Sequence, residues 1–73
     1  MSPEWTLAYS TTLDFQAALI KEMLEDQGVV VVLVNKKDSS YIIIGDIEIY
    51  VSIDDLIRAK HLIKKFFESG ESN

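Results

Sequence analysis

The sequence predicts a small α+β domain in which two helices cover one face of a three-stranded antiparallel sheet. Three observations lead to this prediction: two amphipathic segments with helical spacing, three segments with strand character, and their succession in the order β-α-β-β-α. A chain of 73 residues suffices for a single domain, 1–73. We expect it to fold over about residues 4–69 and to end in a frayed tail, 70–73.

The first predicted strand spans 5–10, where large and small side chains alternate. One side carries Trp5, Leu7 and Tyr9, and the other carries Thr6, Ala8 and Ser10. A period of two indicates a strand.

The two predicted helices follow from apolar residues at helical spacing. The first begins after Thr11 and Thr12, which can cap it, and ends at Gly28. The second begins at Ser52, three residues before Asp55 in a pattern like a capping box, and ends at Gly70. The first helix has the stripe Leu13, Ala17, Ile20 and Leu24, flanked by Leu19 and Met23; the second has Leu56, Ala59, Ile63 and Phe66, broadened by Ile53, Leu62 and Phe67.

The remaining strands are predicted at 29–34 and 46–52. Residues 29–34 are continuously aliphatic, so both faces of that strand are apolar. Residues 46–52 alternate, with Ile47, Ile49 and Val51 on one face. A right-handed crossover leaves a gap that the third strand fills, which predicts the order 1-3-2. This is the ferredoxin-like plan without its usual fourth strand.

The predicted sheet has one face without helices. Either the odd-numbered or the even-numbered residues of 29–34 face outward, beside Thr6, Ala8, Glu48 and Tyr50. Because an exposed apolar patch on a small domain usually marks an interaction site, we expect a homo-oligomer or a protein partner bound through this face or the free strand edge. The alternative is that residues 41–44 fold back over the valines.

Composition and charge argue against several functions. The net charge of −5 disfavours nucleic acid and anionic membranes as partners. The chain has no cysteine and a single histidine, His61, and it offers no recognisable catalytic constellation. We therefore expect no enzyme, no cofactor and no metal. The absence of a signal-peptide pattern and of a long apolar run predicts a cytoplasmic protein.

The strongest candidate for a binding site is the polar segment 35–41. It is longer than a tight hairpin requires, and it offers ammonium, amide, carboxylate and hydroxyl groups. The candidate binding residues are Asn35, Lys36, Lys37, Asp38, Ser39, Ser40 and Tyr41, with Tyr50 on the neighbouring strand. The structural alternative is an Asx-type turn in which the side chains of 38–40 bond their own backbone.

Four segments carry a pattern that extends from about residue 5 to residue 63. They are 5–9, Ala17-Ala18-Leu19-Ile20-Lys21, 34–41 and 45–51, and the most specific is Asn35-x-x-Asp38-Ser39-Ser40-Tyr41 followed by Gly45-Asp46-Ile47-Glu48-Ile49-Tyr50-Val51. This pattern resembles a bacterial family of unknown function whose members are labelled prokaryotic signal-transducing proteins. That family is similar in fold to the nitrogen-regulatory PII proteins, which are ferredoxin-like trimers. PII proteins bind nucleotides and small metabolites near a long loop between their second and third strands.

The resemblance implies a role in signal transduction, and the loop here is far shorter than the PII loop. The leading interpretation is a small non-enzymatic binding or regulatory module. It would recognise a small metabolite, a nucleotide or a protein through 35–41 and the adjacent sheet surface. The alternative is a plain protein-interaction or oligomerisation domain that uses the open sheet face.

Overall fold

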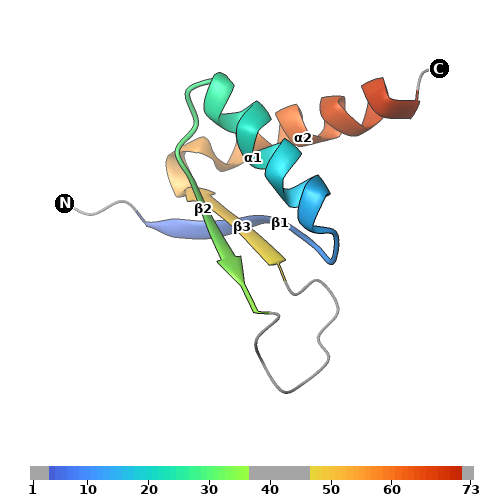
Figure 1. Cartoon of the computed structure of the whole chain (residues 1–73). Coiled ribbons are helices and arrows are strands. Elements are labelled where there is room, and N and C mark those ends of the chain that lie inside the picture. The colour runs from blue at the N-terminus through green and yellow to red at the C-terminus, as the bar shows by residue number, and fades with distance from the viewer. Residues whose placement is uncertain (1–3, 37–46, 72–73) are drawn as a thin grey trace.

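The computed structural model describes residues 4–36 and 47–71 and confirms the predicted order of elements (Figure 1). The strands are β1 (Trp5–Thr11), β2 (Val31–Asn35) and β3 (Ile47–Ser52); the helices are α1 (Asp14–Asp26) and α2 (Leu56–Glu71), with a short 3-10 turn, η1 (Ile53–Asp55), before α2. Within the described residues the strands form one antiparallel sheet of order β1-β3-β2. Both helices lie on the same side of this sheet. The fold is therefore α+β, as predicted.

The core lies between the sheet and the two helices. Ile47, Ile49 and Val51 of the central strand β3 are buried, and the residues between them are only half-buried, so the predicted alternation is confirmed. The other buried apolar residues are Ala17, Ile20 and Leu24 from α1, Val29 and Val31 from the second strand and its approach, and Ala59 and Ile63 from α2. Within the described residues, this core uses one face of the sheet.

The C-terminal end of α1 is set by Gly28, as the sequence predicted. Gly28 has φ +84°, a conformation that favours glycine because it lacks a Cβ atom. Its N–H donates to the carbonyl of Glu25, and the N–H of Val29 donates to the carbonyl of Leu24, each at 3.0 Å. These two bonds form a Schellman motif, which satisfies carbonyls that the helix end would leave unpaired. The guanidinium of Arg58 in α2 donates to the carbonyl of Gln27 at the same end.

The N-terminal end of α1 differs from the prediction that Thr11 and Thr12 cap the helix. Leu13 occupies the N-cap position, and its side chain makes no cap hydrogen bond. Thr11 acts one step earlier: its Oγ1 accepts from the Leu13 N–H at 3.1 Å and donates to Gln16 Oε1 at 2.7 Å. Leu13 was predicted to share the apolar stripe of Ala17, Ile20 and Leu24, but its extended backbone places it outside the helical period, and it is exposed.

The alternation predicted for β1 is interrupted by a β-bulge. Leu7 pairs with Tyr50 and Tyr9 pairs with Ile49, so Ala8 is the extra residue on the β1 side. Ala8 and Tyr9 consequently both pack against the core. Tyr9 contacts Phe67 of α2, with ring centroids 5.4 Å apart. The bulge thus separates Tyr9 from Trp5 and Leu7, with which it was grouped.

The start of α2 is close to the prediction. Ser52 Oγ accepts from the Asp54 N–H at 3.3 Å, so Ser52 does cap this segment, although the first turn is 3-10 and contains Asp55. Ile53 in that turn is exposed, because the 3-10 turn departs from the period that placed it in the apolar stripe. The helix continues to Glu71, one residue beyond Gly70, where the sequence predicted its end.

Candidate functional site

The sheet face that points away from the helices carries a mixed apolar and polar surface, which we call the open sheet face. Paired residues on neighbouring antiparallel strands point to the same side, so the register defines its rows. One row is Leu7, Tyr50 and Val32; the next is Ser10, Glu48 and Val34; Trp5 lies beside Ser52 at one end. Trp5, Leu7, Val32 and Val34 are between 37% and 42% exposed. This exposure is high for large apolar residues within a sheet.

The register decides which valines face outward. Val31 pairs with the buried Val51, whereas Val32 and Val34 pair with Tyr50 and Glu48. The even-numbered set is therefore the outward one. The outer neighbours predicted from β1 were Thr6 and Ala8, and this is wrong. Thr6 pairs with Val51 on the core side, and the bulge at Ala8 places that residue against the core. Residues 41–44, the predicted alternative cover, lie outside the described residues.

A polar cluster lies on the open sheet face where β2 and β3 begin their connection. The Lys36 ammonium and Glu48 Oε1 are 3.1 Å apart, and the Tyr50 hydroxyl donates to the same oxygen at 2.9 Å. The strand period produces this cluster, because Val34 and Lys36 fall on the same face, as do Glu48 and Tyr50. The Glu48 side chain is only 18% exposed, whereas that of Lys36 is 43% exposed.

Lys36 and Tyr50 shift the pKa of Glu48, and Glu48 in turn shifts the pKa of Tyr50. Hydrogen bonds from Lys36 and then from Tyr50 lower the pKa of Glu48, because both donors stabilise the carboxylate. The hydrogen bond to the Glu48 carboxylate raises the pKa of Tyr50, because that bond requires the phenolic proton. Both shifts favour an ionised Glu48 and a neutral Tyr50.

The structure brings together part of the predicted binding residues. Lys36 and Tyr50 meet through Glu48, a residue that was not among the candidates. Asn35 pairs with Ile47 on the core side of the sheet, so it does not join them. Lys37, Asp38, Ser39, Ser40 and Tyr41 lie outside the described residues.

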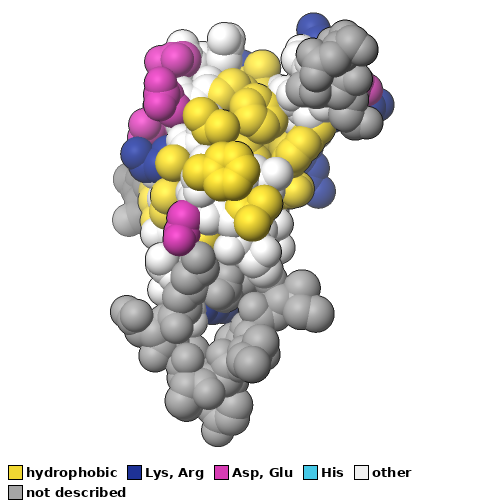
Figure 2. Space-filling model, turned by 45° about the vertical axis from the view of Figure 1, so that its right-hand side comes forward, with side chains coloured by type: hydrophobic (Ala, Val, Ile, Leu, Met, Phe, Trp, Pro, Cys, Tyr) yellow, Lys and Arg dark blue, Asp and Glu magenta, His cyan; other side chains and the backbone are white. Residues whose placement is uncertain are grey.

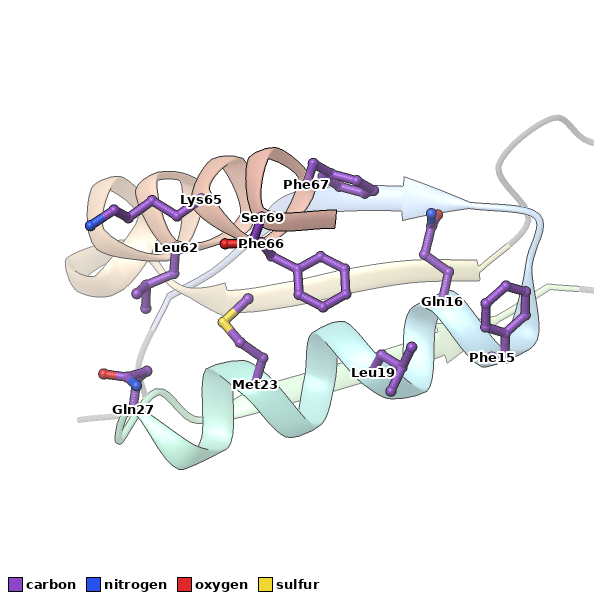
Figure 3. A pocket seen from close by; sticks show the side chains of 10 residues that line it. All are labelled: Phe15, Gln16, Leu19, Met23, Gln27, Leu62, Lys65, Phe66, Phe67 and Ser69. Carbon is purple, nitrogen blue, oxygen red and sulfur yellow. The ribbon is translucent and has the colours of Figure 1, made fainter. Parts of the chain in front are cut away.

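The sequence prediction missed a second surface, an apolar groove between α1 and α2 that we call the helix groove. It has a volume of about 770 Å³. Its walls are Phe15, Gln16, Leu19, Met23 and Gln27 from α1, and Leu62, Lys65, Phe66, Phe67 and Ser69 from α2. Figure 3 shows Met23 and Phe66 pointing toward each other across it. Figure 2 brings this side of the molecule forward and shows hydrophobic side chains gathered in one patch.

A signal for the helix groove was present in the sequence. Phe15, Leu19 and Met23 recur every four residues, beside the buried stripe of Ala17, Ile20 and Leu24. The apolar arc of α1 is therefore wider than contact with the sheet alone requires. Phe15 is 67% exposed and Leu19 is 48% exposed, so these two side chains are not used by the core, whereas Met23 packs against its edge.

The described residues lack two features that could indicate a function, a metal-binding cluster and a membrane-spanning helix. Within residues 4–36 and 47–71, no group of three or more His, Cys, Asp or Glu side chains is placed to hold a metal ion. In that same part of the chain, neither helix combines the length and apolar character that a membrane crossing requires. Comparison of the chain with protein-family models, with curated proteins and with solved structures found no match in any of the three.

Proposed function

We propose that this chain is a non-enzymatic binding module that recognises a protein partner through the open sheet face. The observation that carries the proposal is the row of apolar side chains left accessible on that face. Trp5, Leu7 and Val32 belong to paired strands, yet each keeps about two fifths of its surface in contact with solvent. Exposed contiguous apolar surface on a small protein usually marks an interaction site.

The residue types on the open sheet face suit protein recognition. Trp5 and Tyr50 combine a large rigid ring with a polar group, and such residues contribute much of the binding energy at protein interfaces. Trp5 and Tyr50 lie at the apolar part of the face, while Ser10, Glu48 and Lys36 border it. An apolar centre with a polar rim is the common anatomy of such interfaces.

The charges favour a protein partner over a free phosphate. Lys36, the described lysine of the predicted loop site, is already paired with Glu48. An incoming phosphate would have to compete with that carboxylate for the ammonium. The chain carries a net charge of −5, so the complementary partner has an apolar contact surface bordered by basic groups. The sequence resemblance suggests that such a binding module has a regulatory role in signalling.

The proposal is tested with matched baits in an affinity capture, followed by binding measurements on the captured protein. The variant Leu7→Lys places a charge in the apolar row Leu7, Tyr50 and Val32 of the open sheet face. The control Ile57→Lys makes the same kind of change on α2, which lies on the other side of the sheet (Figure 1), and Ile57 is 85% exposed there. A true partner binds the wild-type and Ile57→Lys chains equally and Leu7→Lys at least about tenfold more weakly.

Trp5 provides the second readout, because it is the single tryptophan of the chain and lies on the open sheet face. The purified partner should move the Trp5 emission to shorter wavelength as the indole loses water. A captured protein that binds Leu7→Lys as well as wild type, or leaves Trp5 emission unchanged, would contradict the proposal.

A thermal-shift screen against nucleotides, small metabolites and divalent ions tests the ligand interpretation. A ligand at about 100 times its Kd stabilises by ~2.7 kcal/mol, which is roughly 10–20 °C for a chain of this size. If a compound gives such a shift and Lys36→Ala removes it, the small-ligand function replaces the proposal made here.

A further inference from the structure

The helix groove presents a second interaction surface, on the opposite side of the molecule from the open sheet face. Figure 3 shows that the two walls of the groove come from different helices, with Gln27 and Lys65 near the same end. A smaller hollow adjoins that end and is lined by Glu22 and Asp26 together with Met23, Gln27 and Phe66. The groove thus has an acidic lip on α1 and a basic lip on α2.

The charges on these lips are available to an incoming surface. Within the described residues, neither Glu22, Asp26 nor Lys65 takes part in an ion pair. The contrast extends along the helices: α1 carries four acidic residues and one basic residue, and α2 carries four basic and two acidic residues. Any occupant of the groove must therefore match an apolar centre flanked by opposite charges.

We propose that the occupant is a second copy of this chain. A twofold axis parallel to the helices places α1 of one copy over α2 of the other and preserves position along the helix axis. Glu22 and Asp26 of one copy then face Lys65 of the second copy, and the reciprocal contact forms by symmetry. Leu19 and Met23, which lie near the level of Phe66 in Figure 3, meet Phe66 of the second copy. The surface complements itself in apolar character and in charge, whereas a foreign helix would need its own acidic and basic flanks in this arrangement.

This dimer leaves both open sheet faces exposed on its two outer sides. The dimer is consequently a bivalent form of the binding module, and its interface shares no residue with the open sheet face. Failure of one proposal is therefore distinguishable from failure of the other: Leu7→Lys leaves the dimer intact, and a groove variant leaves partner binding by one subunit intact.

The first experiment measures molar mass over a range of concentrations by light scattering or sedimentation. The wild-type chain and the control Ile57→Lys should dimerise, and Leu19→Lys should be monomeric at the same concentrations. Circular dichroism verifies that Leu19→Lys is folded. A monomeric wild-type chain at high micromolar concentration would overturn the proposal, as would a folded Leu19→Lys chain that dimerises like wild type.

The second experiment uses charge reversal and stays informative if Leu19→Lys does not fold. Glu22→Lys alone and Lys65→Glu alone each place like charges opposite each other in both symmetric contacts, so each should dimerise about tenfold more weakly. When the two variants are mixed, both contacts pair opposite charges again. The mixture should form a heterodimer with an affinity near that of the wild-type dimer, and this recovery should weaken with added salt. If the mixture associates no better than the separate variants, the helix groove is not the dimer interface.

Discussion

Two neighbouring valines of β2 offer a direct energetic comparison of the two sheet faces. Val31 is 8% exposed and pairs with Val51 on the core side, whereas Val32 is 39% exposed and pairs with Tyr50 on the open sheet face. The substitutions Val31→Ala and Val32→Ala make the same chemical change in the same strand. Strand propensity and edge effects therefore nearly cancel between the two variants. The difference between their losses of unfolding free energy then reports the difference in burial.

The magnitude follows from the exposed fractions. Valine to alanine removes two methyl-sized groups, and each is worth about 0.8 kcal/mol when fully buried. Val31→Ala loses almost all of that transfer energy and leaves a cavity between sheet and helix, so we expect a loss of about 2–3 kcal/mol. Val32→Ala loses roughly three fifths of it with no enclosed cavity, which is about 1 kcal/mol.

Urea denaturation followed by circular dichroism measures both losses. The expected difference of about 1–2 kcal/mol corresponds to a gap of roughly 4–16 °C between the two melting temperatures for a chain of this length. The comparison is made at low protein concentration, so that association does not add to stability. Equal losses for the two variants would refute the reasoning, because Val32 would then be as buried as Val31.

Three further predictions test individual contacts. Glu48→Gln should destabilise the chain at pH 7, and this effect should decline as the pH falls through the folded-state pKa of Glu48, which lies below that of a free glutamate, because the carboxylate stabilises the fold only while it is ionised. Urea titrations over a series of acidic pH values measure the decline, and a difference that does not depend on pH would count against the cluster. Gly28→Ala should lower the free energy of unfolding by about 1–2 kcal/mol, because φ is +84° at this position, although nothing lies within 4 Å of the added methyl group. An unchanged melting temperature would contradict the assigned backbone conformation. Thr11→Val should lower the free energy of unfolding by about 1–2 kcal/mol, because it leaves the Leu13 N–H without its acceptor. Thr11→Ser keeps the hydroxyl and should recover most of this stability. Equal losses of stability in the valine and serine variants would contradict this role of the hydroxyl.

Much of the architecture could be predicted because local patterns and fold rules agree. The alternation from Ile47 to Ser52 determined the buried face of the central strand, and the position of Gly28 determined the end of α1. The order β1-β3-β2 followed from the handedness of the crossover. The first two features depend on short segments whose local preferences agree with the folded chain, and the third depends on a general rule of chain connection.

The errors arose where tertiary pairing overrides a local pattern. The alternation of β1 gives no sign of the extra residue at Ala8, because the bulge exists only in relation to β3. For the same reason, Trp5 and Leu7 were separated in the prediction from Tyr50, which lies beside Leu7. The number of helices was enough to predict that one face of the sheet lacks a cover. The residues on that face could be identified only once the pairing register of the strands was known.

The candidate site was predicted only in part. Lys36 and Tyr50 were among the expected residues. Glu48, the carboxylate that joins them, was predicted on the outer sheet face but not as a binding residue. The helix groove was overlooked because Leu19 and Met23 were interpreted as flanks of one buried stripe. The spacing of Phe15, Leu19 and Met23 defines a separate stripe, which becomes recognisable once the core residues of α1 are known.

The central claim is that one face of the sheet remains accessible in the single chain, and thiol labelling measures this most directly. The chain contains no cysteine, so Val31→Cys and Val32→Cys each introduce one reporter on opposite faces. We predict that Val32→Cys reacts with a thiol reagent at least about tenfold faster than Val31→Cys, whose reaction must wait for local opening of the core. Equally slow labelling at both positions would contradict the account, because the outward valines would then be covered within one subunit.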